Sequence, residues 1–143
     1  MRTLITLLAL LIFTSCTIRP EPIVYGEDSC HSCSMTIVDR QHAAEIVTKK
    51  GKVYKFDAAE CMIRAIPEWG DDKIGMYLVT DYAQPGKLVD AEMASFVVSP
   101  KVTSPMRANL CAMKNSDRAK KLQQELEGNI YSWEEIQHHL AKN

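Results

Sequence analysis

The sequence predicts an α+β domain with antiparallel or mixed sheets. Three observations support this prediction: alternating apolar stretches typical of strands, a glycine turn between two of them, and capped amphipathic helices. The expected order is strand, hairpin, helix, strand, and then strand, strand, helix, helix. Both halves therefore run from β to α, which suggests a weak internal duplication with halves at about 26–82 and 83–143.

The first half is expected to start with a strand over residues 33–38. In such a strand Cys33, Met35 and Ile37 point to one face. A β-hairpin follows over 43–56, with Gly51 at a turn position that requires positive φ.

The first helix is expected directly after this hairpin. Asp57-Ala58-Ala59-Glu60 resembles a capping box, with Asp57 as N-cap and Glu60 three positions later. Apolar residues then recur at helical spacing, namely Ala58, Cys61, Met62, Ala65 and Ile66. For Cys61 and Met62, buried packing is the favoured interpretation.

A strand over 75–80 is expected to complete the first half, and a strand over 94–98 belongs to the second half. A loop over 81–90 separates them. The segment Ser104-Pro105-Met106 is interpreted as irregular and exposed because proline disfavours a central strand. A short strand is expected over 108–112.

Two helices complete the chain. The first opens at Ser116 and stops at Gly128. The second begins with a capping box between Ser132 and Glu135. The pair His138-His139 near its end is interpreted as surface residues, not ligands.

The N-terminus predicts a lipoprotein signal peptide over 1–15. It has a positive start, an apolar run too short to span a bilayer, and small residues before Cys16, the expected lipidation site. A lipidated tether over 16–25 then leads to one domain over 26–143. The expected location is the cell envelope, lipid-anchored to a membrane and facing the periplasm. An ordinary signal peptide with an incidental cysteine is the alternative.

Charge and cysteine content limit the kinds of partner and the disulfides that the protein can have. The chain has 17 basic and 18 acidic residues, so loss of Arg2 leaves 16 against 18 and no nucleic-acid footprint. Of five cysteines, four remain after lipidation of Cys16: Cys30, Cys33, Cys61 and Cys111. An even number outside the cytoplasm permits two disulfides, in three connectivities.

The segment Cys30-His31-Ser32-Cys33-Ser34-Met35 concentrates soft donors. Thiolate and thioether on one face of a strand favour Cu(I) over Zn(II). Three other interpretations stay open: Met35 as a core residue, a Cys30–Cys33 disulfide, and a redox-active C-x-x-C. A c-type haem is excluded because Ser34 stands where histidine is required.

An ordered set of motifs runs through the chain: Cys33-Ser34-Met35-Thr36-Ile37, Ala43-Ala44-Glu45, Gly51-Lys52, Glu60-Cys61-Met62, Ala94-Ser95-Phe96-Val97 and Ser104-Pro105-Met106. This set resembles the NosL family, copper-chaperone lipoproteins that serve maturation of nitrous oxide reductase. The resemblance implies two ββαβ-like units and a Cu(I) site of Cys and Met sulfur. It also implies delivery toward nitrous oxide reductase, in company with an ABC-type membrane complex.

Cys33 and Met35 match the C-x-M pair of that family, and Met106 matches its Pro-Met. Ser34 and Arg107 stand where glycine is frequent. The candidate metal ligands are therefore Cys33, Met35 and Met106, with Cys30 and His31 as additional donors. The expected activity is binding and transfer of copper, not catalysis.

Two alternatives come from other classes. An envelope thiol–disulfide oxidoreductase would use Cys30 and Cys33 and would not need the methionines. A structural lipoprotein would have packed or cross-linked cysteines and would bind no stoichiometric copper.

Overall fold

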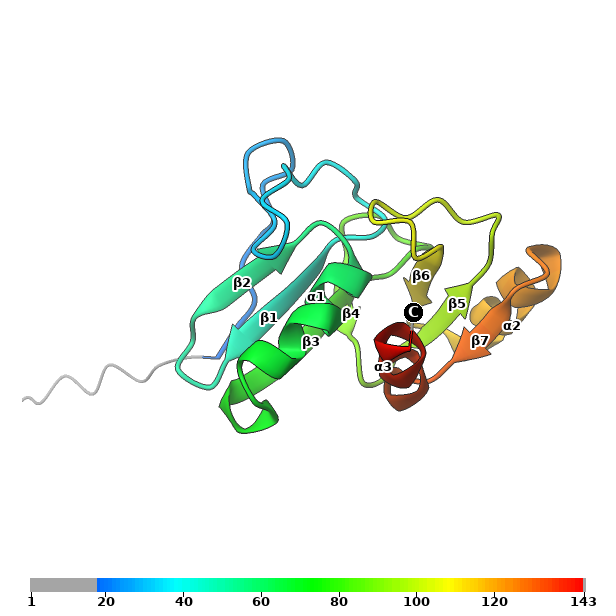
Figure 1. Ribbon diagram of the computed structural model, residues 1–143. Coiled ribbons are helices and arrows are strands. Elements are labelled where there is room, and N and C mark those ends of the chain that lie inside the picture. Colours follow the sequence, from blue (N-terminus) through cyan, green and yellow to red (C-terminus); the bar gives the residue numbers. More distant parts are fainter. Residues whose placement is uncertain (1–17, 143) are drawn as a thin grey trace, which may run out of the picture.

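Two small antiparallel sheets lie side by side in the computed structural model, which describes residues 18–142 (Figure 1). The strand orders are β2-β1-β3-β4 and β6-β5-β7. The strands are β1 (Ala44–Thr48), β2 (Val53–Phe56), β3 (Ile74–Thr80), β4 (Leu88–Asp90), β5 (Ser95–Val98), β6 (Leu110–Met113) and β7 (Asn129–Tyr131). The helices are α1 (Ala59–Ala65), α2 (Ser116–Glu125) and α3 (Trp133–Ala141), with short 3₁₀ turns η1 (Ile66–Glu68) and η2 (Asp71–Lys73). The α+β prediction is confirmed, whereas the signal peptide over 1–15 and Cys16 lie outside the described residues.

The two sheets repeat one topology. Each unit runs strand, strand, helix, strand (β1β2α1β3 and β5β6α2β7), and in each the first strand lies in the centre. The two ββαβ-like units that the resemblance implied are therefore present. Strand β4 pairs with β3 at the edge of the first sheet, inside the segment 81–90 that the sequence predicted as a loop.

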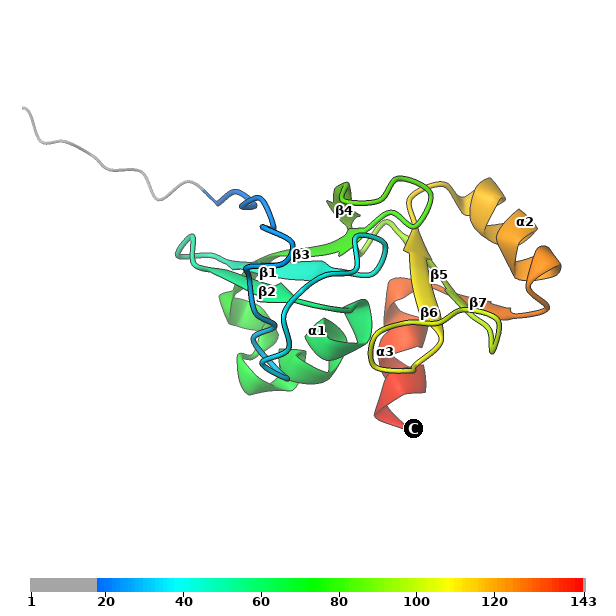
Figure 2. The same cartoon turned by 90° about the horizontal axis from the view of Figure 1, so that it is seen from above.

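Helix α3 joins the two units. Its Trp133 ring packs against Tyr77 of the first sheet at 5.2 Å and against Phe96 of the second at 5.8 Å, between ring centroids. Figure 2 shows α3 between α1 and the second sheet. The predicted capping box is confirmed, because Ser132 and Glu135 each accept a hydrogen bond from the other's backbone N–H. One hydrophobic core therefore spans both sheets.

The predicted strand over 33–38 is wrong. A turn over 31–33 leads into an irregular segment, Ser34 has a φ of +61°, and only an isolated bridge joins Ser29 to Thr36. Met35 is 51% exposed while Ile37 is fully buried, so the two do not share a face. The local turn around the two cysteines overrides the apolar alternation, which was too short to specify a strand.

The predicted capping box at the start of α1 is also wrong. The N-cap is Ala58, and no side chain caps this end of the helix. The Glu60 carboxylate instead accepts a hydrogen bond from the Ser104 hydroxyl of the second unit. Glu60 therefore contacts the second unit, whereas the Asp57 carboxylate lies beside Cys30, Cys33 and Cys61, and neither side chain caps the helix.

Candidate metal centre

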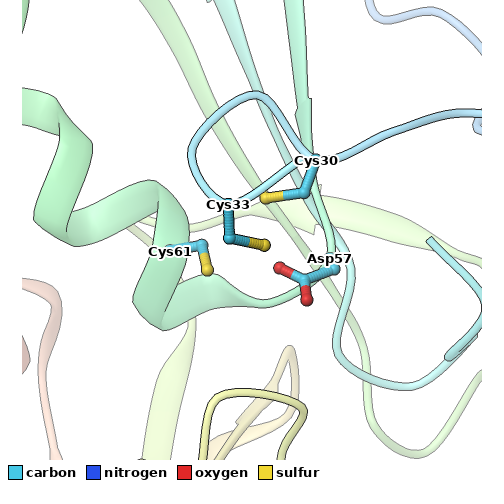
Figure 3. A group of neighbouring side chains, drawn as sticks. All are labelled: Cys30, Cys33, Asp57 and Cys61. Atoms are coloured by element: carbon cyan, nitrogen blue, oxygen red, sulfur yellow. The ribbon is translucent and has the colours of Figure 1, made fainter. Parts of the chain in front are cut away.

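Three cysteines and one aspartate converge at the start of α1. The group consists of Cys30, Cys33, Asp57 and Cys61, whose ligand atoms all lie within 4.8 Å of one another. Figure 3 shows the three sulfur atoms and the carboxylate directed toward a common centre. We call this group the thiol cluster.

Backbone hydrogen bonds shape the turn that supplies two of these thiols. The Ser34 N–H donates to the Cys30 carbonyl at 2.9 Å, and the Cys30 N–H donates to the Met35 carbonyl at 2.8 Å. The His31 N–H donates to the Lys55 carbonyl at 2.8 Å, which fastens the turn to β2. The turn therefore lies against the sheet, and both cysteine side chains point into the space that they share with Asp57 and Cys61 (Figure 3).

The fold supplies the other two groups from one short stretch. Asp57 directly follows β2 and Cys61 lies four positions later, in α1. Asp57 precedes the helix N-cap, and its carboxylate and the Cys61 thiol point to the same space (Figure 3). Cys30, Asp57 and Cys61 are 2%, 3% and 4% exposed, whereas Cys33 is only partly buried. Cys33 is thus the thiol nearest to solvent.

The thiols differ strongly in acidity. A hydrogen bond with the Cys61 thiol, supported by the backbone N–H groups of Cys33 and Asp57, lowers the pKa of Cys30 to about 6. The same interaction with Cys30, together with burial, raises the pKa of Cys61. Burial also raises the pKa of Cys33. The hydrogen bond therefore favours the thiolate form of Cys30 and the protonated form of Cys61, and metal binding would displace the thiol protons that remain.

Met106 lies on the loop between β5 and β6, next to α1. One Glu60 oxygen accepts hydrogen bonds from the Ser104 hydroxyl at 2.6 Å and from the Met106 N–H at 3.3 Å. Because Glu60 directly precedes Cys61, this contact places the Met106 backbone beside the helix turn that carries a cluster thiol. The partly buried Met106 side chain packs on the same core as Cys33.

Met35 and His31 lie at the periphery. Met35 is half exposed. The His31 ring packs against Tyr54, with 4.7 Å between ring centroids, and against Trp69 at 5.3 Å. His31 supplies no ligand atom to the thiol cluster, although it lies between the two N-terminal cysteines in the sequence.

Cys111 belongs to the second unit. It is 2% exposed in a core formed with Val97 and Ala119, and burial raises its pKa to about 12. The four cysteines within residues 18–142 are free thiols. This inert, buried thiol is a natural control for the three clustered ones.

Sequence reasoning assigned Asp57 to helix capping and Cys61 to packing, and so missed both as members of the cluster. The available signal was their closeness in the sequence, since Asp57 lies just before the helix and Cys61 lies in its first turn. The C-x-x-C pair was recognised, but its relation to α1 depends on long-range packing.

The NosL family model matches residues 23–141. No curated protein matches the chain. The crystal structure of the copper chaperone NosL from Shewanella denitrificans is similar, with a TM-score of 0.72 and 20% identity over 83% of this chain and 96% of that chain. At this identity the likeness establishes a common fold. Among residues 18–142 no helix has both the length and the apolar character needed to cross a membrane.

Proposed function

The chain belongs to the NosL family, and on this premise we propose that it is a membrane-anchored metallochaperone that binds Cu(I) and delivers it for assembly of the copper centre of nitrous oxide reductase. The observation that carries the proposal is the convergence of Cys30, Cys33 and Cys61 on one point. Cu(I) prefers two or three soft ligands, so three thiols at this spacing supply a complete set.

The burial gradient of the thiols suits transfer. Cys30 and Cys61 are buried and would hold the ion, while the more exposed Cys33 would be the first ligand exchanged with an incoming partner sulfur. Met106 and Met35 would contribute thioethers, which bind without losing a proton. His31 is a further donor at the rim. The proposal involves ligand exchange only and no catalysis.

Membrane attachment through lipid on Cys16 completes the proposal. The segment after the proposed anchor is fastened to the first sheet, since the Glu21 N–H donates to Glu45 on β1 at 3.0 Å. The Lys55 ammonium of β2 donates to the Pro22 carbonyl at 2.9 Å. A short tether would hold the thiol cluster close to membrane-bound partners, including an ABC-type maturation complex, and so raise their effective concentration.

The oxidoreductase alternative fits this burial less well. Its attacking thiolate would be Cys30, whose pKa is lowered to about 6. That side chain is 2% exposed and hydrogen-bonded to Cys61, so a substrate disulfide has poor access to it.

A Cu(I) competition titration on reduced protein tests the copper proposal. Wild type should bind Cu(I) stoichiometrically, and replacement of Cys30, Cys33 or Cys61 by Ser should lower the affinity by orders of magnitude. Cys111→Ser is the matched control and should bind like wild type. Unchanged affinity in the three cluster variants would refute the site.

Delivery requires its own measurement. Copper-loaded protein should restore the copper spectrum of copper-free nitrous oxide reductase, and Cys33→Ser should slow that transfer. If the protein binds copper tightly but does not transfer it to nitrous oxide reductase, then delivery to this enzyme is refuted and copper binding stands.

A further inference from the structure

Basic side chains gather at one end of the first sheet, at the turn that joins β1 to β2. The turn supplies Lys49, Lys50 and Lys52, and the Lys49 N–H donates to the carbonyl of Lys73 at 2.9 Å, which brings a fourth lysine to the same place. All four residues are exposed, and within the part of the chain that the structure describes none of them forms an ion pair. We call these four lysines the basic end.

Acidic residues near the basic end balance it only in part. Two aspartates, Asp71 and Asp72, directly precede Lys73 in the sequence. The Asp72 carboxylate turns back toward Gly70, where an added Cβ would lie 3.0 Å from its oxygen. Four lysines against two aspartates leave a positive surface in a chain whose formal net charge is -1. Unpaired ammonium groups on an exposed turn attract anionic surfaces without a preformed pocket.

The described chain begins at this same end of the sheet. The Ile18 side chain packs on Gly75 of β3, where an added Cβ would lie 3.2 Å from the Ile18 Cγ2 and 3.3 Å from the carbonyl oxygen of Val47 on β1. Val47 and Gly75 are each two positions from a lysine of the basic end, Lys49 and Lys73 respectively. Figures 1 and 2 both show the first described residues near the turn between β1 and β2.

The proposed lipid anchor at Cys16 lies only two residues before Ile18. Consecutive Cα atoms are 3.8 Å apart, so two residues span no more than about 8 Å. Lipid on Cys16 would therefore hold the basic end close to the membrane surface. At physiological ionic strength this span is about one Debye length, so the lysines are near enough to interact with charged headgroups.

We propose that the basic end contacts the membrane and binds the headgroups of anionic phospholipids. The inference rests on the proposed anchor at Cys16 and adds a second, electrostatic contact to it. A single lipid anchor leaves the domain free to rotate, whereas two contacts fix its orientation.

The second contact determines where the thiol cluster faces. Strand β2 leads from Lys52 at the basic end to Asp57 of the cluster. At 3.3 Å per residue this strand separates the two by roughly 17 Å. With the basic end on the membrane, the cluster would be directed away from the lipid and toward a recipient that approaches from the aqueous phase.

Hydrogen exchange of the full, lipid-bearing chain on vesicles tests this contact. The N–H groups of Lys49, Gly51 and Lys52 are hydrogen-bonded, so their exchange measures how readily the turn opens to water. On vesicles of phosphatidylcholine mixed with phosphatidylglycerol, the turn should exchange roughly threefold or more slowly than on phosphatidylcholine alone. Sodium chloride at about 0.5 M should remove this difference, because salt screens the attraction between lysines and headgroups.

A triple variant removes the charge without removing the anchor. Lys49→Gln, Lys50→Gln and Lys73→Gln, combined in one chain, should abolish the difference in exchange between the two kinds of vesicle. The chain should stay attached to both, because its lipid is unchanged. The matched control replaces three exposed lysines of the second unit by glutamine, namely Lys114, Lys120 and Lys121, and should keep the difference.

Wild type that stays attached but exchanges equally on both kinds of vesicle overturns the inference and leaves the anchor intact. Loss of the difference in the control variant also overturns it, because net charge and not the basic end would then be responsible. Equal slowing by inorganic phosphate on phosphatidylcholine vesicles would indicate a site for a free anion and would overturn the membrane contact. A chain that attaches to neither vesicle removes the proposed anchor and the inference with it.

Discussion

The Glu60 carboxylate accepts a hydrogen bond of 2.6 Å from the Ser104 hydroxyl, although 44 positions separate these residues. Both side chains are buried, at 0% and 1% exposure. The bond joins α1, which carries Cys61, to the loop that carries Met106. It therefore fixes the position of a predicted thioether ligand relative to the thiol cluster.

Glu60→Ala should destabilise the protein by about 1–3 kcal/mol, because it leaves the buried Ser104 hydroxyl without its acceptor. Urea unfolding measures this change. Cu(I) affinity should also fall, since the Met106 backbone loses its contact with α1. Glu60→Gln keeps an acceptor oxygen and should retain most of both properties. If Glu60→Ala and wild type had the same unfolding free energy and the same Cu(I) affinity, the hydrogen bond would contribute to neither.

The acidity of Cys30 gives a second prediction. Thiolate absorbance of metal-free protein should rise with a midpoint near pH 6, the pKa of Cys30, and Cys30→Ser should abolish this step. Cys61→Ala should raise the midpoint because the hydrogen bond that lowers the pKa is lost. Cys61→Ser retains a hydroxyl donor and should raise it less. A midpoint that stays near the ordinary thiol value of 9.0 in wild type contradicts the assignment.

The same shift has a consequence for stability. The pKa of Cys30 falls from 9.0 in the unfolded chain to about 6 in the folded protein, so the unfolded state binds more protons between these values. The contribution of Cys30 to the free energy of unfolding is therefore complete above pH 9 and disappears as the pH falls through 6. The raised pKa of Cys61 acts in the opposite direction above pH 9. Cys30→Ser should therefore lose the rise in unfolding free energy between pH 6 and 9, which denaturation at several pH values measures.

Glu45 provides a third prediction, away from the cluster. It is fully buried on β1, and burial raises its pKa to about 7. The folded state therefore binds more protons than the unfolded state between pH 4.5 and 7, and stability falls as the pH rises through this window. Between pH 5 and pH 8, Glu45→Gln should gain about 1–3 kcal/mol relative to wild type, since glutamine does not ionise. Urea unfolding at both pH values measures the difference, and the exposed Glu68→Gln should show none. A constant gap between Glu45→Gln and wild type would contradict the raised pKa.

Local patterns predicted most of the elements. The hairpin over 43–56, the amphipathic face of α1 and the capping box at Ser132 depend on neighbours a few positions apart, and all three are present. Strands β4 and β7 are only three residues long, so their pairing, not their sequence, defines them. Short edge strands carry too little periodicity to be recognised.

The metal centre was predictable only in part. Cys33 and Cys30 were recognised because their spacing is local, and both belong to the cluster. Cys61 and Asp57 have other plausible roles in a helix start, and what makes them neighbours of the C-x-x-C turn is its docking on β2. The alternation from Cys33 to Ile37 was misleading because Ser34 has a positive φ and the segment forms no strand, so successive side chains do not alternate between two faces.

The two methionines give the last prediction. Met106→Leu preserves the side-chain volume but removes the sulfur, so any loss of Cu(I) affinity measures the contribution of the thioether to copper binding. We expect a larger loss for Met106→Leu than for Met35→Leu, because Met106 is held beside Cys61 by Glu60, whereas the half-exposed Met35 must be drawn in. X-ray absorption of the Cu(I) protein should show one sulfur neighbour fewer in Met106→Leu. Met93→Leu, at a position 78% exposed, is the control. If all three variants bind Cu(I) alike, then copper is held by thiols alone, and the loop fastened by Glu60 serves the fold and not the metal.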